Sequence, residues 1–429
     1  MSLPSPEPEP GVHVEPSLPR PDGGFSTRAV KGSVILPDVQ QAPVSAGIWL
    51  SSTWGADRSA DVGELLLDEQ PGYVYGRYDN PTATTLHGVI ASLHDAPAAW
   101  SLASGTAAIH ATLDVLRGTG RILATEQIYG GTWALLRRME RDAGWGVDHA
   151  PLATADQLTA ALTDDHTVVH VESVANPSMV VTDLPALVEV CRERGVALVV
   201  DNTFASPWLC RPYELGATAV VESATKFLGG HGDVVAGVVA GDAPLIDAVR
   251  RHTYELGASL GAFEAWLILR GVQTLSLRVR QASASALAIA TALEQDPRPE
   301  VVRYPGLGDH PEHALATGLF AGRGYGALVA FDLPGREQAE AFADACSVFV
   351  RASSLGGTHS LVLHPGSTSH RQLDAASLAS AGLRPGTVRL SIGIEDVEDL
   401  LADLQQALAT AMPDVTSSSA TAPAGGVDP

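Results

Sequence analysis

The sequence predicts an α/β protein with one large domain and a smaller second domain of α+β structure, on the basis of two patterns. From residue 97 to residue 239, short apolar runs alternate with amphipathic helical patterns. The runs carry hydrophobic residues at both odd and even positions, as strands buried on both faces do. Past about residue 271, a long helical pattern, two isolated strand patterns and a closing helix indicate a separate, smaller unit.

The individual elements follow from this alternation. In the large domain, strands are expected at residues 98–102, 121–124, 167–171, 197–200, 219–221 and 234–239, and helices at 106–116, 132–142 and 184–193. In the second domain, a helix is expected at 275–293, strands near 325–331 and 387–392, and a helix at 397–411. The rhythm of the first part is that of βα units, which build a parallel sheet between layers of helices.

The chain is long enough for two domains and additional tails. Residues 1–24 and 413–429 have a composition that buries little apolar surface, and we expect both to be disordered tails. Residues 25–78 precede the first clear strand as an N-terminal arm. Residues 79–272 form the large domain, and residues 273–412 the C-terminal domain.

Composition limits the possible partners and compartment. The net charge of −22 and a sequence pI of about 4.9 predict repulsion of a nucleic-acid backbone. The N-terminus lacks the pattern of a secretory signal, and no apolar run approaches a membrane span, so we expect a cytoplasmic protein. Cys191, Cys210 and Cys346 are widely spaced, which favours buried reduced thiols over disulfides or a zinc site.

Lysine usage singles out one residue. Of 27 lysine and arginine residues only two are lysine, Lys31 and Lys226. Lys226 follows an apolar run and precedes a glycine cluster, as Ser-Ala-Thr-Lys-Phe-Leu-Gly-Gly-His. An amine in a partly dry site can form an imine with an aldehyde, whereas a guanidinium does not. We therefore interpret Lys226 as a Schiff-base lysine; the alternative is a chance surface lysine.

Other segments at the predicted strand ends suit a pyridine aldehyde phosphate. Asp201, at the end of a strand, can keep a pyridine nitrogen protonated, although a turn or helix cap is an equally ordinary role. Gly105 and Thr106 lie where a strand passes into a helix, and their backbone N–H groups can receive a phosphate. Ser223 and Thr225 add hydroxyl donors. Tyr129 precedes two glycines that let a flat ligand approach, or is simply a loop tyrosine.

Two arginines are candidates for anion binding. Arg77, in Y-G-R-Y-D-N-P-T, can clamp a phosphate with a bidentate contact. Arg389 lies in the otherwise apolar run Val-Arg-Leu-Ser, where a guanidinium either pairs with a structural carboxylate or awaits a ligand's carboxylate. Taken alone, the structural pair is the more ordinary role for Arg389.

Together these segments resemble a known family. The motifs, in chain order, are Y-x-Y-x-R-x-x-N-P-T, S-G-T-A-A, Y-G-G-T, E-S-V-A-N-P, D-N-T-F, S-A-T-K-F-x-G-G-H-G-D, S-L-G-G-x-x-S-L-x-x-H-P and R-L-S-I-G-I-E-D. They resemble the pyridoxal-phosphate enzymes of cysteine and methionine metabolism, which include cystathionine γ-synthase, cystathionine and methionine γ-lyases and acylhomoserine sulfhydrylases. The resemblance extends over about residues 27–408. It implies the aspartate-aminotransferase-like fold type I and a homotetramer built from active-site-sharing dimers.

The resemblance also implies which residues bind pyridoxal 5′-phosphate. Lys226 would hold the cofactor, Asp201 would pair with its ring nitrogen, and Tyr129 would stack on its face. Asn176 resembles the residue near the phenolic oxygen. The phosphate would be bound by Gly105, Thr106, Ser223 and Thr225, together with Tyr75 and Arg77 from the neighbouring subunit's arm.

The implied activity is γ-elimination from a sulfur amino acid, giving a 2-oxo acid, ammonia and a thiol. Arg389 and the backbone around Ser354 would hold the substrate's α-carboxylate, Lys226 would move protons, and Tyr129 would assist proton transfer. The alternative is γ-replacement on an activated homoserine, as in cystathionine γ-synthase or a sulfhydrylase. The chain offers no Walker or dinucleotide-binding motif, and its histidines lack an H-E-x-x-H helix, so a nucleotide-binding domain and a zinc hydrolase are poor alternatives.

Two positions bear on the substrate. Family members that act on cystathionine commonly carry an arginine two positions after Y-G-G-[TS], and often a glutamate just before S-L-G-G. This chain has Ala134 and Ser353 there, which predicts a preference for an uncharged γ-substituent. Gly131 replaces a cysteine typical of methionine γ-lyases, and Arg58 or Arg351 could supply a cation from another direction.

Overall fold

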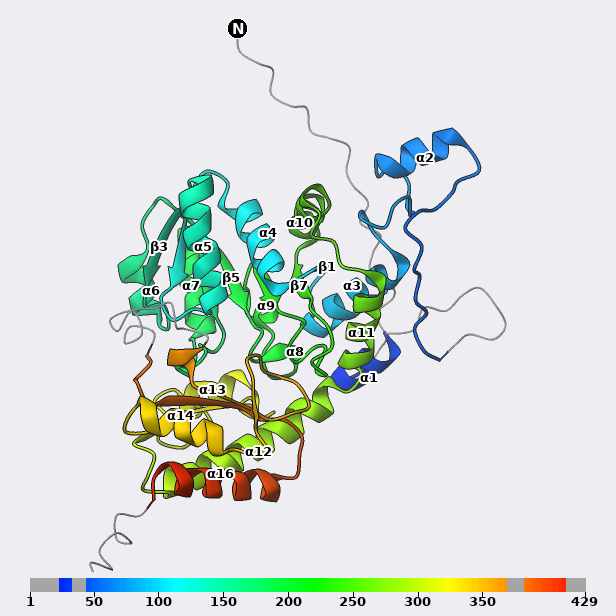
Figure 1. Cartoon of the computed structure of the whole chain (residues 1–429). Coiled ribbons are helices and arrows are strands. Elements are labelled where there is room, and N and C mark those ends of the chain that lie inside the picture. The colour runs from blue at the N-terminus through cyan, green and yellow to red at the C-terminus, as the bar shows by residue number, and fades with distance from the viewer. Residues whose placement is uncertain (1–22, 33–43, 369–381, 414–429) are drawn as a thin grey trace, which may run out of the picture.

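The computed structural model describes residues 23–32, 44–368 and 382–413 (Figure 1). The two predicted tails lie almost wholly outside the described residues. The chain begins with two arm helices, α1 (Phe25–Lys31) and α2 (Ser59–Leu66), and then enters a large α/β unit. A long helix, α12 (Leu275–Gln295), leads from this unit into a second one built on its own sheet.

The first sheet has seven strands in the order β1-β7-β6-β5-β4-β2-β3. Strand β7 runs antiparallel to its neighbours β1 and β6, and the other six strands run in one direction. The strands are β1 (Ala98–Leu102), β2 (Arg121–Thr125), β3 (Gly146–Ala150), β4 (His166–Glu172), β5 (Ala197–Asp201), β6 (Ala219–Glu222) and β7 (Gly237–Gly241).

Helices cover both faces of this sheet, because its strands are apolar on both sides. In β5, Leu198 and Val200 belong to the core on one face, while Val199 belongs to the core on the other. The second of these cores is closed by α4 (Gly105–Arg117), α5 (Gly130–Ala143) and α10 (Ala243–Leu256). The remaining helices of the unit are α3 (Pro81–His94), α6 (Ala155–Ala161), α7 (Leu184–Arg194), α8 (Ser206–Leu209), α9 (Pro212–Leu215) and α11 (Ala262–Val272).

The second sheet has five strands in the order β10-β11-β12-β9-β8. Its core joins residues of α12, α14 (Arg336–Ala345) and α16 (Val397–Ala411) to the apolar face of the sheet. The strands are β8 (Val301–Arg303), β9 (Leu328–Asp332), β10 (Val350–Arg351), β11 (Leu361–Leu363) and β12 (Thr387–Ser391), with α13 (His313–Leu319) and a short 3₁₀ turn, η1 (Pro365–Ser367), between them.

Most predicted elements are confirmed, often to within a residue or two. The strand predicted at 234–239 is wrong at its start: residues 234–236 form a loop, because the backbone of Ala236 bonds to Thr225, and β7 begins at Gly237. The strand predicted from residue 325 begins only at Leu328, after a turn in which Gly326 has a positive φ. The sequence analysis missed β3, β8, β10 and β11, which are short or polar strands. Three buried, free cysteines are confirmed.

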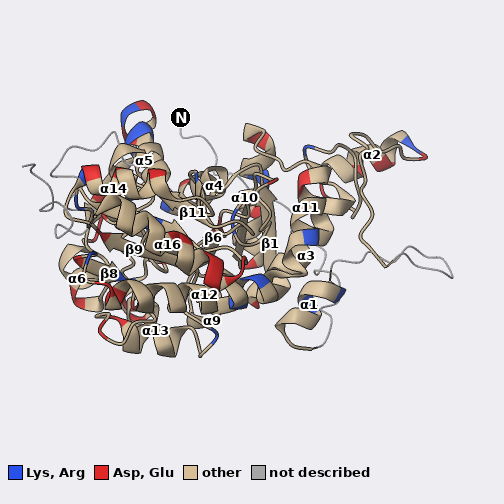
Figure 2. Cartoon of the chain, turned by 60° about the horizontal axis from the view of Figure 1, so that its bottom comes forward, with Lys and Arg blue, Asp and Glu red and all other residues tan. Residues whose placement is uncertain are grey.

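The arm stands out from the body in Figure 1, where α2 projects beyond the large unit. Two ion pairs, each with one arginine, link the arm to the large unit. Arg28 of α1 bonds Asp95 at 2.6 Å, and Arg250 of α10 bonds Asp68, just after α2, also at 2.6 Å. Elsewhere, basic and acidic residues are interspersed along the helices (Figure 2). Among the described residues, no helix is long and apolar enough to cross a membrane.

Candidate active site

The candidate residues gather at the carboxyl edge of the seven-stranded sheet, where ligands bind in open α/β sheets. Each comes directly from a strand end or the turn after it: Ser104 and Gly105 follow β1, Tyr129 follows β2, Glu172 ends β4, Asp201 ends β5, and Ser223 to Lys226 follow β6. The parallel direction of these strands brings to one edge residues that are up to 122 positions apart in sequence.

Lys226 lies in a tight turn after β6 and is half-buried. Its Nζ donates a hydrogen bond of 2.8 Å to the Ser354 hydroxyl, from the loop after β10. Burial and the nearby Arg389 guanidinium lower the pKa of Lys226 to about 8. The turn itself is held from α12, where Arg278 donates to the carbonyl of Phe227 at 2.8 Å. A neutral amine is therefore accessible near physiological pH, as a lysine nucleophile or base requires.

Arg389 lies in the middle of β12 and is 5% exposed. Its Nη2 donates to the Ser354 carbonyl at 2.6 Å, and its Nη1 donates to Asn176 Oδ1 at 3.3 Å. Its Nε is buried and has no hydrogen-bond partner. Burial lowers its pKa to about 10. Within the described part of the chain no carboxylate pairs with it, so the structural ion pair considered above is wrong there, and the arginine is free to receive a ligand's carboxylate.

Glu172 links the loops of Tyr129 and Asn176. Its Oε1 accepts the backbone N–H of Tyr129 at 2.7 Å, and its Oε2 accepts that of Asn176 at 3.4 Å. Tyr129 is 50% exposed. Its ring lies over Gly131, where an added Cβ would stand 2.4 Å from Tyr129 Cε1. A glycine at position 131 is therefore what allows the tyrosine to lie this way.

Asp201 is connected to the predicted phosphate site through Thr203. The carboxylate of Asp201 accepts the Thr203 N–H at 2.9 Å, and the Thr203 hydroxyl accepts the Ser223 N–H at 2.8 Å. Ser223 in turn packs on Gly105, where a Cβ would lie 2.8 Å from the serine Cβ. Burial raises the pKa of Asp201, and a cationic partner would favour the ionised form of this carboxylate.

The N-terminus of α4 forms the other side of this site. Ser104 caps the helix, and its hydroxyl accepts the N–H of Ala107 at 3.1 Å. The first backbone N–H groups of a helix have no partner within the helix, and here they belong to Gly105 and Thr106. An α-helix of 13 residues that begins with two such groups beside a serine hydroxyl is suited to an anion.

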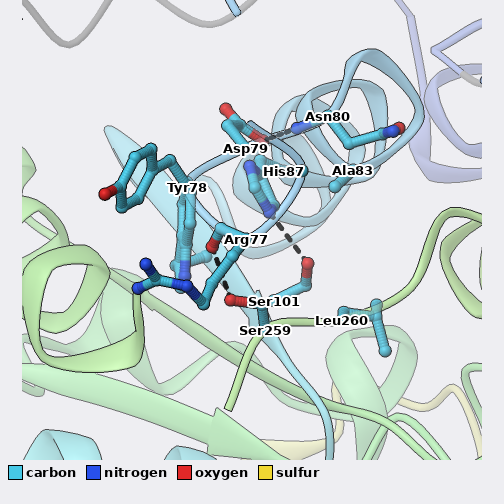
Figure 3. A pocket seen from close by; sticks show the side chains of 11 residues that line it. Arg77, Tyr78, Asp79, Asn80, Ala83, His87, Ser101, Ser259 and Leu260 are labelled. Atoms are coloured by element: carbon cyan, nitrogen blue, oxygen red, sulfur yellow. Dashed lines mark hydrogen bonds between the residues drawn. The ribbon is translucent and has the colours of Figure 1, made fainter. Parts of the chain in front are cut away.

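Three predicted cofactor residues make hydrogen bonds or ring contacts with other residues of this chain. The Thr225 hydroxyl exchanges hydrogen bonds with the backbone of Ala236, at 3.0 and 3.2 Å. Tyr75 and Arg77 lie in the arm, and Arg77 lines a small pocket between α3, β1 and the loop of Ser259 (Figure 3). There the Arg77 guanidinium bonds the carbonyl of Tyr254. Among described residues, no hydrogen bond joins Tyr75 or Arg77 to the Lys226 site, so their assignment stays a prediction about a partner subunit.

The sequence analysis gave no role to two other buried acids at this edge. Glu172 is one of them. The other is Glu222, which accepts Asn202 Nδ2 at 2.8 Å and lies 3.4 Å from His94 Nε2. Both carry a raised pKa because of burial and the nearby Asp201. The sequence signal that could have identified these two acids is a glutamate at the end of an apolar strand pattern. Ser354 has a φ of +91°, a strained value for a non-glycine residue, which local sequence does not reveal.

Comparisons with known proteins show the family to which the chain is similar. The pattern of the Cys/Met metabolism PLP-dependent enzymes matches residues 26–409. An L-methionine γ-lyase of Pseudomonas putida is 38% identical over 92% of this chain and 99% of its own. An O-succinylhomoserine sulfhydrylase of Pseudomonas aeruginosa is 38% identical over 90% of this chain and 95% of its own. The crystal structure of a cystathionine γ-synthase of Xanthomonas oryzae pv. oryzae, 35% identical, superposes with a TM-score of 0.85 and covers 91% of this chain and 99% of its own.

Proposed function

The chain belongs to the Cys/Met metabolism PLP-dependent enzymes, and from this premise we propose that it catalyses γ-elimination from a sulfur amino acid with an uncharged γ-substituent. The products are a 2-oxo acid, ammonia and a thiol. The observation that carries the proposal is the contact chain from the Lys226 amine through Ser354 to the unpaired Arg389.

The residues fit pyridoxal 5′-phosphate. Lys226, with a pKa of about 8, is suited to hold its aldehyde carbon, and Asp201 to pair with its ring nitrogen. The close Gly105–Ser223 contact and the start of α4 suit its phosphate. Its ring would rest against Tyr129. When bound, the cofactor supplies an electron sink that makes the Cα hydrogen of an amino acid acidic.

Arg389, Lys226 and Tyr129 have separate roles in substrate binding and proton transfer. Arg389 grips the substrate's α-carboxylate with a guanidinium that is already oriented by Ser354 and Asn176. The Lys226 amine, kept in place by the Ser354 hydroxyl, takes the Cα proton and moves protons towards Cβ. Tyr129, which is half exposed and whose backbone N–H is held by Glu172, donates a proton to the departing sulfur. Water completes the reaction by releasing ammonia and the 2-oxo acid.

The contacts of Arg58 and Arg351, the two arginines considered as alternative cations, support an uncharged γ-substituent. Ala134 and Ser353 offer no charge to a distal carboxylate. Arg58 is committed to Asp61, with which it forms two hydrogen bonds. Arg351 donates to three backbone carbonyls, those of Ala343, Asp344 and Cys346, at the end of α14. Moving either arginine to a substrate would break these contacts, so a distal carboxylate would be desolvated without a partner, at a cost of about 1–3 kcal/mol.

The second candidate function is γ-replacement on an activated homoserine. It is favoured by the 38% identity to a sulfhydrylase, which equals the identity to the methionine γ-lyase. Both reactions begin with loss of the γ-substituent, and they differ in whether water or a thiol completes the turnover. The same contacts of Lys226, Ser354 and Arg389 serve both.

The arm supports assembly with a second copy. Trp49, Leu50 and Leu67 are 51%, 76% and 70% exposed, an unusual apolar display for a monomer. Tyr75, at 43%, and Arg77 are exposed, and Arg77 would have to leave the Tyr254 carbonyl to reach a neighbouring site. We propose active-site-sharing dimers that pair into a homotetramer, with residues 25–78 as arm, 79–272 as large domain and 273–412 as C-terminal domain. The cytoplasmic location stays a prediction.

Steady-state kinetics test this proposal. We expect kcat/KM for methionine or homocysteine to exceed that for cystathionine by at least tenfold, with thiol and 2-oxo acid formed in equal amounts. O-acetylhomoserine with and without sulfide separates elimination from replacement. Cystathionine as the best substrate by tenfold would overturn the assignment of an uncharged γ-substituent. Faster sulfide-dependent turnover of O-acetylhomoserine would favour the second candidate.

A further inference from the structure

Glu172 uses both of its carboxylate oxygens to join two loops of the site. Oε1 accepts the Tyr129 N–H at 2.7 Å, across 43 residues of sequence, and Oε2 accepts the Asn176 N–H at 3.4 Å. The carboxylate is 6% exposed. Its own backbone is fixed as well, since its carbonyl accepts the Thr182 hydroxyl at 2.7 Å. The side chain is therefore a fixed point to which both loops are attached.

The two loops carry site residues, Tyr129 and Asn176, that must be held in fixed positions relative to each other. Tyr129 is the first residue before α5, and no side chain caps that helix, so the bond to Glu172 is the contact that fixes its backbone N–H. Asn176 accepts a hydrogen bond from Arg389 at 3.3 Å. One carboxylate thus sets the position of the exposed tyrosine ring and, through Asn176, of the buried guanidinium.

Glu172 also stands beside Asp201. The two residues are direct partners in the register of β4 and β5. Residues on neighbouring strands at the same level point to the same face of the sheet. Both acids are buried, and each is deprived of solvent that would stabilise its charge. A protonated ring nitrogen at Asp201 would supply the positive charge that this pair lacks.

We propose that Glu172 is a positioning residue of this active site, which holds the Tyr129 ring and the Asn176–Arg389 contact in register with Asp201. The inference rests on the proposed function, because it assumes a cofactor ring between Asp201 and Tyr129. It extends that function by adding a residue that acts through Tyr129 and Asn176 and does not itself touch the substrate or the reacting atoms. Its effect is on the orientation of the bound cofactor and on the chemical step.

The chain offers a matched control in Asp403. This carboxylate is also buried, at 3% exposed, and accepts the backbone N–H groups of Ser347, Val348 and Phe349 at 2.8, 2.8 and 3.0 Å. It lies on α16, in the core of the second sheet. Asp403→Asn therefore reports the loss of a buried carboxylate that fixes a loop but, among the described contacts, bonds to none of Lys226, Asp201 and Arg389.

The experiment compares Glu172→Gln, Glu172→Asp and Asp403→Asn as cofactor-loaded proteins. Glu172→Gln keeps the reach of the side chain but replaces one acceptor oxygen with a donor, and Glu172→Asp keeps the charge but shortens the reach. For both we expect a kcat at least tenfold lower and a visible circular dichroism signal, per bound cofactor, at most half that of the wild type. For Asp403→Asn we expect a lower Tm, with kcat and this signal within twofold of the wild type.

Either of two results overturns the inference. One is a Glu172→Gln protein in which the Tm is lowered but kcat and the dichroism signal are unchanged, as expected for Asp403→Asn. The other, useful if the glutamine variant does not fold, is a Glu172→Asp protein with wild-type kcat and dichroism. Failure of the proposed function would give a different result, because the wild-type protein would then release no thiol. In that case the dichroism of the bound cofactor would still test the role of Glu172.

Discussion

At the scale of single residues, the site works by placing an amine beside a guanidinium in a region with little water. Arg389 lacks a carboxylate partner among the described residues, so its charge acts on whatever lies nearby. Burial first, and the Arg389 guanidinium second, lower the pKa of Lys226, and Ser354 accepts a hydrogen bond from each of the two side chains. A substrate carboxylate that neutralises Arg389 would remove the second of these causes, so substrate binding and the basicity of Lys226 are linked.

The first prediction concerns the pH at which Lys226 reacts. A lysine pKa lowered from its ordinary value to about 8 means that the neutral amine appears on raising the pH through 8. We expect covalent attachment of pyridoxal phosphate to cofactor-free protein to be slow at pH 6, half-maximal near pH 8 and level above pH 9. Stopped-flow absorbance measures it, with Lys226→Arg as the unreactive control. A rate that continues to climb to pH 10.5 would show an unperturbed lysine.

Much of this residue set could be predicted from the sequence, for identifiable reasons. Lys226 is conspicuous in a chain that otherwise uses arginine, and Asp201 and Arg389 are charged residues in or at the end of apolar runs. The tether from Glu172 to Tyr129 and Asn176 was not predicted, because it joins a strand end to a loop 43 positions away. The positive φ of Ser354 was not predicted either, because nothing in the local sequence indicates that a serine, rather than one of the glycines after it, adopts this conformation.

At the scale of elements, the ends of helices and strands create the site. Asn80 caps α3 by accepting the Thr82 N–H at 2.8 Å, and Pro81 occupies the first helical position, so the N-P-T motif starts a helix. Ser104 does the same for α4 and leaves Gly105 at the sheet edge. Strand β3 was missed because it is an edge strand with Asp148 and His149 at its centre, so it lacks the apolar pattern of buried strands.

The second prediction concerns the start of α4. In Gly105→Ala, the new Cβ would lie 2.8 Å from Ser223 Cβ and 3.0 Å from Ser223 Cα, so the helix start and the serine must separate. We expect the dissociation constant for pyridoxal phosphate to rise at least tenfold, about 1.4 kcal/mol. Equilibrium dialysis or absorbance titration measures it.

The control for this change is Gly318→Ala in α13. This glycine is also helical, but a Cβ there meets no atom within 4 Å. Alanine in an open helical position stabilises a protein by about 0.4–1 kcal/mol. We therefore expect Gly318→Ala to leave cofactor affinity unchanged and Tm equal or higher. Equal affinity in Gly105→Ala and Gly318→Ala would mean that the contact with Ser223 does not shape the cofactor site.

At the scale of the whole molecule, two sheets meet at the site and the arm stands apart. The large unit supplies Lys226, Asp201, Tyr129 and Asn176, and the second sheet supplies Arg389 through β12. The contact from Arg389 to Asn176 therefore crosses between the two units, and so does the contact from Lys226 to Ser354. This convergence was predicted only through the family resemblance, because no local pattern relates residues 213 positions apart.

The third prediction tests the role of the arm in assembly. Arg77→Ala and Lys226→Ala proteins are each expected to be inactive. If Arg77 serves a neighbouring chain, a dimer of one variant with the other contains one site with both native residues. Random mixing should then restore about a quarter of wild-type activity, since half of the dimers are mixed and half of their sites are intact. No recovery in mixed dimers, verified by differential tags, would place Arg77 outside the shared site.

The central claim is that this chain is a pyridoxal-phosphate enzyme that works from Lys226, and borohydride reduction of the cofactor-loaded protein followed by peptide mass mapping tests it most directly. With only Lys31 and Lys226 available, the map has two possible lysine outcomes. The account predicts one pyridoxyl group per chain, on the peptide containing Lys226, with Lys31 unmodified and turnover of the sulfur amino acid lost. A label on Lys31, or full activity in a protein whose Lys226 carries no label, would contradict it.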